Sequence, residues 1–127
     1  MEKQDIQRVI ENYIQAYNTF DVDGMLANMD EKVIFKNLSN GETTLTTAGI
    51  DGFKKQALQA KPLFKERKQT ITHMTIDHDQ AEVIIEFKAV LASDFPNGSK
   101  AGDKLSFKGK SLFEFRNGKI ISLTDIS

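Results

Sequence analysis

The chain contains no cysteine, which excludes disulfide bonds, a thiol nucleophile and a zinc site built on thiolates. It also lacks a strong charge of either sign, because 17 lysines and arginines against 18 aspartates and glutamates leave a formal net charge of −1. Such a balance provides no general attraction to nucleic acids or to anionic membranes. We therefore expect neither nucleic acid nor membrane as a partner.

Long hydrophobic runs are missing as well. No stretch approaches the roughly 20 apolar residues that cross a bilayer, and the opening MEKQDIQRVIENY is too polar for a signal peptide. The expected location is the cytoplasm. With 127 residues, of which 39% are hydrophobic, the chain fits one globular domain over residues 1–127.

Helices are predicted in the first half of the chain. Apolar residues recur every three or four positions over Ile6–Tyr17, which places them on one face of a helix. A short second helix is predicted at about Val22–Met29, with Asp21 or Asp23 as the residue that caps its N-terminus.

A third helix is predicted after the sequence GIDG at residues 49–52. Its apolar side carries Phe53, Ala57 and Leu58, and Pro62 limits its length because proline disfavours helix at the preceding residue. No glycine-rich phosphate cradle precedes the basic run that follows. We therefore interpret this run as a solvent-exposed helix exit; it consists of Lys61, Lys65, Arg67 and Lys68.

Six strands are predicted around and after the third helix. The Asn-Gly pair at 40–41 joins the first two as a hairpin turn. In the fourth strand the odd positions are uniformly apolar, so they face the interior. On its outer face, Ile84 and Val90 are apolar, whereas a face exposed to solvent is expected to be polar. This favours a homodimer formed through the outer sheet face. The predicted strand ranges are 32–37, 42–47, 67–77, 81–91, 105–115 and 119–126.

The order of these elements predicts an α+β fold with the helices on one side of a mainly antiparallel sheet. No cofactor motif is present, so none is expected. The two histidines, His73 and His78, are five residues apart, a spacing that does not place both on one strand face. Because no acidic ligand motif accompanies them, we expect no metal site.

Three segments carry a family resemblance: YIQAYN at residues 13–18, DVDGML at 21–26 and FEFRNGKII at 113–121. In this order they resemble the nuclear transport factor 2-like superfamily, in particular its SnoaL-like and ketosteroid-isomerase-like branches. The resemblance implies a cone-shaped, strongly curved antiparallel (mixed) sheet packed around a long N-terminal helix and two shorter helices. It also implies a homodimer and cofactor-free chemistry. It does not settle function, because members include isomerases, cyclases, dehydratases and assembly domains.

A ketosteroid-isomerase-like site needs a carboxylate base and two hydrogen-bond donors for the enolate oxygen. The resemblance places one donor at Tyr13, the base at Asn37 and the acidic donor at Ser111. An amide cannot abstract the proton, and a serine hydroxyl lacks the acidity of a protonated carboxyl group. We therefore do not expect steroid-isomerase activity.

Asp125 is the carboxylate that could take over the acid–base role. It is predicted to share a face with Ile121 and Leu123, and the resemblance implies that this face lines the pocket. Apolar walls that include Phe87 and Phe107 would disfavour the charged carboxylate and raise its pKa, which suits a general acid or base. The alternative is that Asp125, two residues from the end of the sequence, lies frayed in solvent.

Three hypotheses for function remain open at this point. The first is a pocket that binds a small, apolar or weakly polar molecule. The second is an isomerase, cyclase or dehydratase with Asp125 as the catalytic acid or base and Tyr13, Asn37 or Ser111 as the group that polarises a carbonyl. The third is a dimerisation or assembly domain. The residues expected to line the pocket are Tyr13, Tyr17, Phe35, Asn37, Phe53, Ile85, Phe87, Phe107, Ser111 and Asp125.

Overall fold

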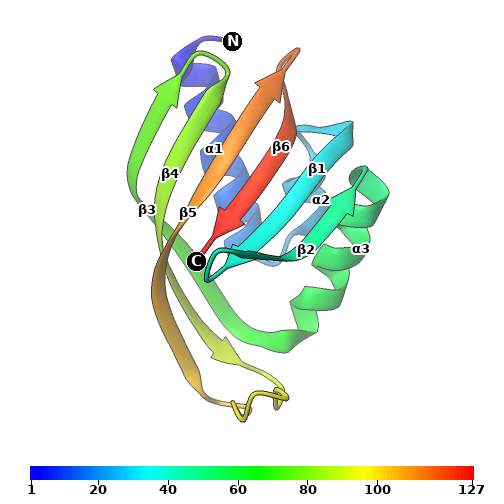
Figure 1. Cartoon of the computed structure of the whole chain (residues 1–127), viewed down its shortest axis with the longest axis vertical. Coiled ribbons are helices and arrows are strands. Elements are labelled where there is room, and N and C mark those ends of the chain that lie inside the picture. Colours follow the sequence, from blue (N-terminus) through cyan, green and yellow to red (C-terminus); the bar gives the residue numbers. More distant parts are fainter.

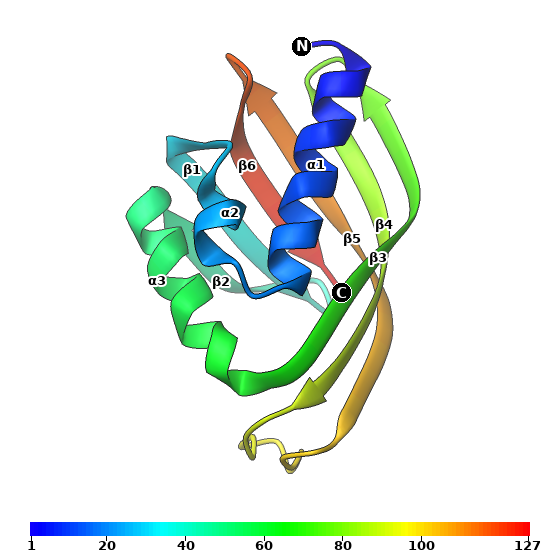
Figure 2. The same ribbon diagram turned by 180° about the vertical axis from the view of Figure 1, so that it is seen from behind.

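A strongly curved sheet holds three helices against its concave face in the computed structural model, which describes all 127 residues (Figures 1 and 2). None of the helices combines the length and apolar character needed to cross a bilayer. The helices are α1 (Lys3–Asn18), α2 (Val22–Leu26) and α3 (Ile50–Ala60), the last followed by a 3-10 turn at Lys61–Leu63. The strands are β1 (Met29–Ser39), β2 (Glu42–Ala48), β3 (Phe64–Asp77), β4 (Gln80–Leu91), β5 (Lys104–Arg116) and β6 (Lys119–Ile126).

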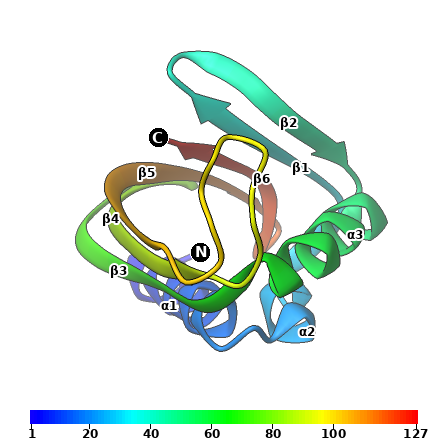
Figure 3. The same cartoon turned by 90° about the horizontal axis from the view of Figure 1, so that it is seen from below.

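The six strands form one sheet in the order β2-β1-β6-β5-β4-β3. Strands β1 and β6 are parallel, and all other neighbours are antiparallel, so the sheet is mixed. The long strands β3, β4 and β5 are strongly curved, as the view from below shows (Figure 3). The predicted α+β class and cone-shaped sheet are therefore confirmed.

The apolar stripe of α1 fills the centre of the cone. Ile6 and Ile10 are fully buried, and the ring of Tyr13 meets the ring of Phe113 edge to face at 5.8 Å between centroids. Every odd position of β4 from Ala81 to Leu91 is buried, as its alternation predicts. The periodicities of 3.6 and 2 therefore identify the two surfaces that form the core.

Two local predictions, the cap of the second helix and the first hairpin turn, are also confirmed. Asp21 caps α2, because its carboxylate accepts a hydrogen bond from the backbone N–H of Gly24 at 2.9 Å. Asn40 and Gly41 both have positive φ, 53° and 80°, which is the conformation of the predicted hairpin turn between β1 and β2.

Two element boundaries and one helix face differ notably from the sequence prediction. The second helix ends at Leu26, and Met29 instead opens β1, where the carbonyl of Asn28 accepts a hydrogen bond from the β6 backbone. Leu58 is 48% exposed, because α3 turns only Phe53 and Ala57 toward the core. Strand β3 begins at 64, three residues earlier than predicted, which moves part of the basic run into the sheet.

The face of β6 next to Asp125 also differs from the prediction. The pairing register between β5 and β6 shifts after Glu114, so Phe115 lies opposite Ile120. Ile120 and Leu123 are consequently buried at 1% and 0% exposure, whereas Ile121 is only half-buried. Ile121 is therefore not on the inner face, because the extra residue in β6 reverses the alternation.

We expect Phe113→Ala to lower the free energy of unfolding by about 3–5 kcal/mol, because Phe113 is 1% exposed and the truncation leaves a cavity beneath α1. Urea denaturation followed by circular dichroism measures this loss. Arg116→Ala, on an exposed position of the same strand, should change stability by no more than about 0.5 kcal/mol. A loss below about 1 kcal/mol for Phe113→Ala would contradict the packing described here.

Candidate functional site

Two adjoining cavities lie between the concave face of the sheet and the helices. The first, of about 280 Å³, lies mainly against β3, β4, β5 and the end of β6. The second, of about 310 Å³, lies between α1, α3, β1 and β2. Tyr17, Asn37 and Asp125 line both cavities, so the two spaces meet at these three side chains.

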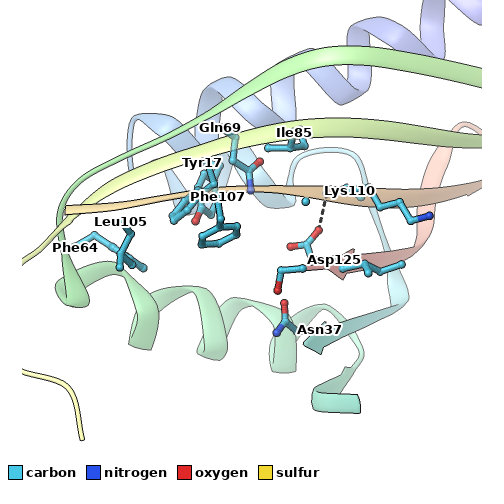
Figure 4. A pocket seen from close by; sticks show the side chains of 14 residues that line it. Tyr17, Asn37, Phe64, Gln69, Ile85, Leu105, Phe107, Lys110 and Asp125 are labelled. Carbon is cyan, nitrogen blue, oxygen red and sulfur yellow. Dashed lines mark hydrogen bonds between the residues drawn. The ribbon is translucent and has the colours of Figure 1, made fainter. Parts of the chain in front are cut away.

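All ten residues expected to line a pocket do line one of these cavities. The second cavity contains Tyr13, Phe35 and Phe53, and the first contains the rest. Phe107 is 46% exposed and packs on Phe87 with 5.0 Å between ring centroids, so it lies at the mouth of the first cavity rather than in its interior wall (Figure 4). Ligand binding by these residues stays a prediction.

A row of three polar residues crosses the inner face of the sheet. The pairing register places Asn37 of β1 opposite Asp125 of β6, and Asp125 opposite Ser111 of β5. Ser111 Oγ donates a hydrogen bond to Asp125 Oδ1 at 2.7 Å (dashed in Figure 4), and Asn37 Nδ2 donates to Thr44 Oγ1 at 2.9 Å. The two positions that depart from the steroid-isomerase pattern therefore flank a carboxylate on the strand between them.

Asp125 is held in place and is not frayed. The backbone N–H of Ser127 donates to the carbonyl of Leu38 at 3.0 Å, so β6 stays paired with β1 through the end of the sequence. Burial disfavours the charged carboxylate and raises the pKa of Asp125 to about 6, although the hydrogen bond from Ser111 works in the opposite direction. Asp125 therefore changes charge close to neutral pH.

Two phenols face the same space. Burial, followed by the nearby charge of Asp125, raises the pKa of Tyr13 well above its usual value. Burial likewise raises the pKa of Tyr17 to about 12. Both hydroxyls therefore keep their protons at neutral pH and can donate hydrogen bonds to an oxygen of a ligand.

Arg67 lies in the site, although the sequence predicts it in a solvent-exposed basic run. The neighbouring lysines of its basic run are exposed, but Arg67 is only 5% exposed and lines the second cavity. Its Nε donates to the carbonyl of Tyr17 at 2.9 Å, and its guanidinium carbon lies 3.8 Å from the centroid of the Tyr17 ring. The missed signal was the alternation that begins at Arg67, after a register shift near the start of β3, and places Arg67, Gln69 and Ile71 on the inner face.

Gly109 lines the first cavity opposite Ile85 of β4. A Cβ atom at this position would lie 2.7 Å from the carbonyl oxygen of Ile126, closer than such contacts occur in proteins. Only glycine therefore allows β5 and the end of β6 to approach in this way.

The sequence profile of the SnoaL-like domain family matches residues 10–123. The chain belongs to the SnoaL-like domain family. A search among curated proteins finds no match to it.

Several solved structures share the SnoaL-like fold of this chain. A proposed polyketide cyclase from Xanthomonas campestris pv. campestris has a TM-score of 0.83 and 19% identity, covering 98% of this chain and 91% of that one. A proposed SnoaL-like polyketide cyclase from Jannaschia sp. CCS1 has a TM-score of 0.81 and 14% identity, covering 98% and 85%. AclR of Streptomyces galilaeus, a proposed hydroxylase, has a TM-score of 0.78 and 14% identity, covering 98% and 89%. At these identities the similarity shows the common fold.

The raised pKa of Asp125 predicts a pH-dependent stability difference from Asp125→Asn. Native Asp125 holds a proton up to about pH 6, whereas the unfolded carboxyl loses it near 3.8, so wild-type stability falls as pH rises between these values. Relative to the variant, the wild type should lose up to about 3 kcal/mol between pH 3.5 and pH 7.

Urea denaturation of both proteins across this pH range measures the difference. Glu82→Gln, which removes a carboxylate from an exposed position of β4, is the control and should follow the wild type. A stability difference between wild type and Asp125→Asn that does not change with pH would show that the carboxyl group has an ordinary pKa.

Proposed function

We propose that this SnoaL-like chain binds a small, mainly apolar organic molecule inside the cone, and that Asp125 transfers a proton to or from it. One observation carries the proposal: Asp125 lines both cavities where they meet, with Ser111 bound to one of its carboxylate oxygens. The raised pKa of Asp125 suits this role, because a group that titrates near pH 6 is both an effective base and an effective acid near neutrality.

The walls of the cavities support an apolar ligand. Phe35 and Phe53 meet edge to face at 5.4 Å in the second cavity, and Phe64, Phe87 and Phe107 surround the outer part of the first. Hydrophobic residues make up half of the lining of the first cavity and more than half of that of the second. Apolar walls with a small number of placed polar groups are the usual composition of a small-molecule site.

The arrangement fits removal of a proton from the carbon next to a carbonyl group. The carboxylate of Asp125 would take the proton, the electron pair of the C–H bond would form a carbon–carbon double bond, and the π pair of the carbonyl group would move onto its oxygen to give an enolate. Tyr13 and Tyr17, both protonated at neutral pH, would donate hydrogen bonds to that oxygen. Reprotonation of the enolate elsewhere gives an isomerase, and attack on a second carbonyl gives a cyclase. The structural neighbours described as proposed polyketide cyclases support the second outcome.

Exchange of an acidic carbon-bound proton tests the proton transfer without knowledge of the natural substrate. We expect the wild-type protein to accelerate exchange of the C1 protons of 2-tetralone in deuterated buffer, with a rate that rises with pH up to about 6–7, where Asp125 is ionised. Asp125→Asn should slow this exchange by about 100-fold or more, toward the rate without protein. Proton NMR measures the loss of the C1 signal.

Glu82→Gln serves as the matched control, since it removes one carboxylate from the outer face of the sheet and should leave the exchange rate unchanged. Equal rates for wild type and Asp125→Asn would refute Asp125 as the base. Ligand binding by the cavities could then still be measured separately, by perturbation of the NMR signals of the lining residues.

We also propose that two copies pack through the outer face of the sheet. All three helices lie on the opposite face (Figures 1 and 2), and Ile84 and Val90 are only half-buried on the uncovered side. Contact with a second copy would remove this apolar surface from water.

Sedimentation velocity tests the dimer. At a protein concentration of about 10 µM, a dimer with a micromolar or lower dissociation constant is populated. Ile84→Lys should shift the population to the monomer, because it places a charge in the contact. Lys55→Gln, an exposed position of α3 on the opposite side of the sheet, is a control for charge changes alone. A wild-type protein that sediments strictly as a monomer would contradict the proposal.

A further inference from the structure

Arg67 is a buried cation without a countercharge. The residue is 5% exposed, and none of the ion pairs within 4.0 Å in the chain involves its guanidinium group. Leaving a buried charge unpaired destabilises a protein, so such a group calls for a specific explanation.

Part of the explanation is structural. The carbonyl of Tyr17, which accepts from Arg67 Nε at 2.9 Å, belongs to the last turn of α1, and that turn contains no basic residue of its own. Arg67 therefore supplies the cation that the negative end of this helix favours. Its guanidinium group also stacks on two rings, with its central carbon 3.8 Å from the centroid of Tyr17 and 4.5 Å from that of Phe20.

These contacts fix the guanidinium group but use little of its hydrogen-bonding capacity. A guanidinium group has five N–H donors, and the contacts within the chain engage only the one on Nε. Nη2 has no partner within the chain and is sealed from open space by its neighbours, so a ligand reaches it after a small shift of these side chains. A role in holding α1 to β3 explains where Arg67 lies, but it does not explain the unused edge of the guanidinium group.

Arg67, whose hydrogen-bonding capacity is largely unused, lines the second cavity together with Tyr13, Tyr17 and Asp125. A guanidinium group that is fixed by stacking and by one hydrogen bond loses little freedom when it binds an anion. Its planar edge matches the two oxygens of a carboxylate, which accept two parallel hydrogen bonds. Asn37, Thr44 and Gln56 also line this cavity, but most of the remaining wall is apolar, with Phe35 and Phe53 in contact with each other.

We propose that the ligand of this site is an apolar carboxylate, whose carboxylate group binds the free edge of Arg67 and whose apolar body lies against Phe35 and Phe53. This inference rests on the proposed function, because it specifies the ligand of the same cavity. It adds one charged group to the small, apolar or weakly polar molecule that the sequence predicts. Arg67 positions the ligand, and Asp125, at the junction with the first cavity, acts on a more distant part of it.

Two ligands of nearly the same shape test the proposal: 2-naphthoate, which is charged, and 2-naphthamide, which is neutral. Calorimetric titration at pH 7.5 gives the dissociation constant of each. We expect the wild-type protein to bind 2-naphthoate about tenfold or more tightly than 2-naphthamide, as charge-assisted hydrogen bonds from a buried arginine require. In Arg67→Gln this preference should fall to about twofold or less, with the affinity for 2-naphthamide nearly unchanged.

Two further variants keep the test independent of the structural role of Arg67. Arg67→Lys retains the charge but not the planar edge, so it should keep part of the preference for the carboxylate. Arg116→Gln removes an arginine from an exposed position of β5 and should leave the preference at the wild-type value. If Arg67→Gln does not fold, the comparison of the two ligands in the wild type and Arg67→Lys decides the question.

The possible failures are distinguishable. Equal affinity of the wild type for the two ligands would overturn the carboxylate and leave a neutral ligand for the proposed function. A preference that persists in folded Arg67→Gln would likewise overturn the role of Arg67. If neither ligand binds at millimolar concentration, the cavity is not a site for such molecules, and the proposed function and this inference both fail.

Discussion

The difference in width between one helix and a six-stranded sheet is the constraint on which the rest of this structure depends. A helix with its side chains is about 10 Å across, whereas six strands spaced at about 4.8 Å extend over roughly 24 Å. The stripe of α1 therefore covers only part of the concave face, and α2 and α3 cover more of it. Curvature of β3, β4 and β5 encloses what is left, so the cavities are the part of the sheet that the helices are too narrow to fill.

Residues whose position follows from local periodicity were predicted well from the sequence. The alternation of β4 identified its buried face, and the Asn-Gly pair identified the first hairpin, because each signal depends only on neighbours in the chain. Ile121 was assigned to the wrong face because a register shift depends on the partner strand. Arg67 was assigned to solvent because the run of lysines around it hid the alternation of β3, and because its partner, Tyr17, lies 50 positions away. The cavity residues were found through the family resemblance, which supplies the long-range information that periodicity lacks.

Asp125 and Arg67 are buried groups of opposite charge, and burial shifts the pKa of each for the same physical reason. Burial favours the neutral form of each, so it raises the pKa of Asp125 and lowers that of Arg67. Each residue also has one compensating hydrogen bond, from Ser111 to Asp125 and from Arg67 to the carbonyl of Tyr17. The overall charge of −1 is a property of the surface and does not describe this interior, where one acid and one base face an apolar space.

The position of the Asp125 carboxylate depends on Gly109, a residue that contributes no side chain to the site. The missing side chain at 109 lets the carbonyl of Ile126 approach, and Ile126 directly follows Asp125 in β6. Any larger residue at 109 would displace that segment and carry the carboxylate with it. In a randomised library this position would therefore be as intolerant as Asp125 itself, although it contributes no functional group, and a redesign of the pocket has to treat the empty space at 109 as fixed.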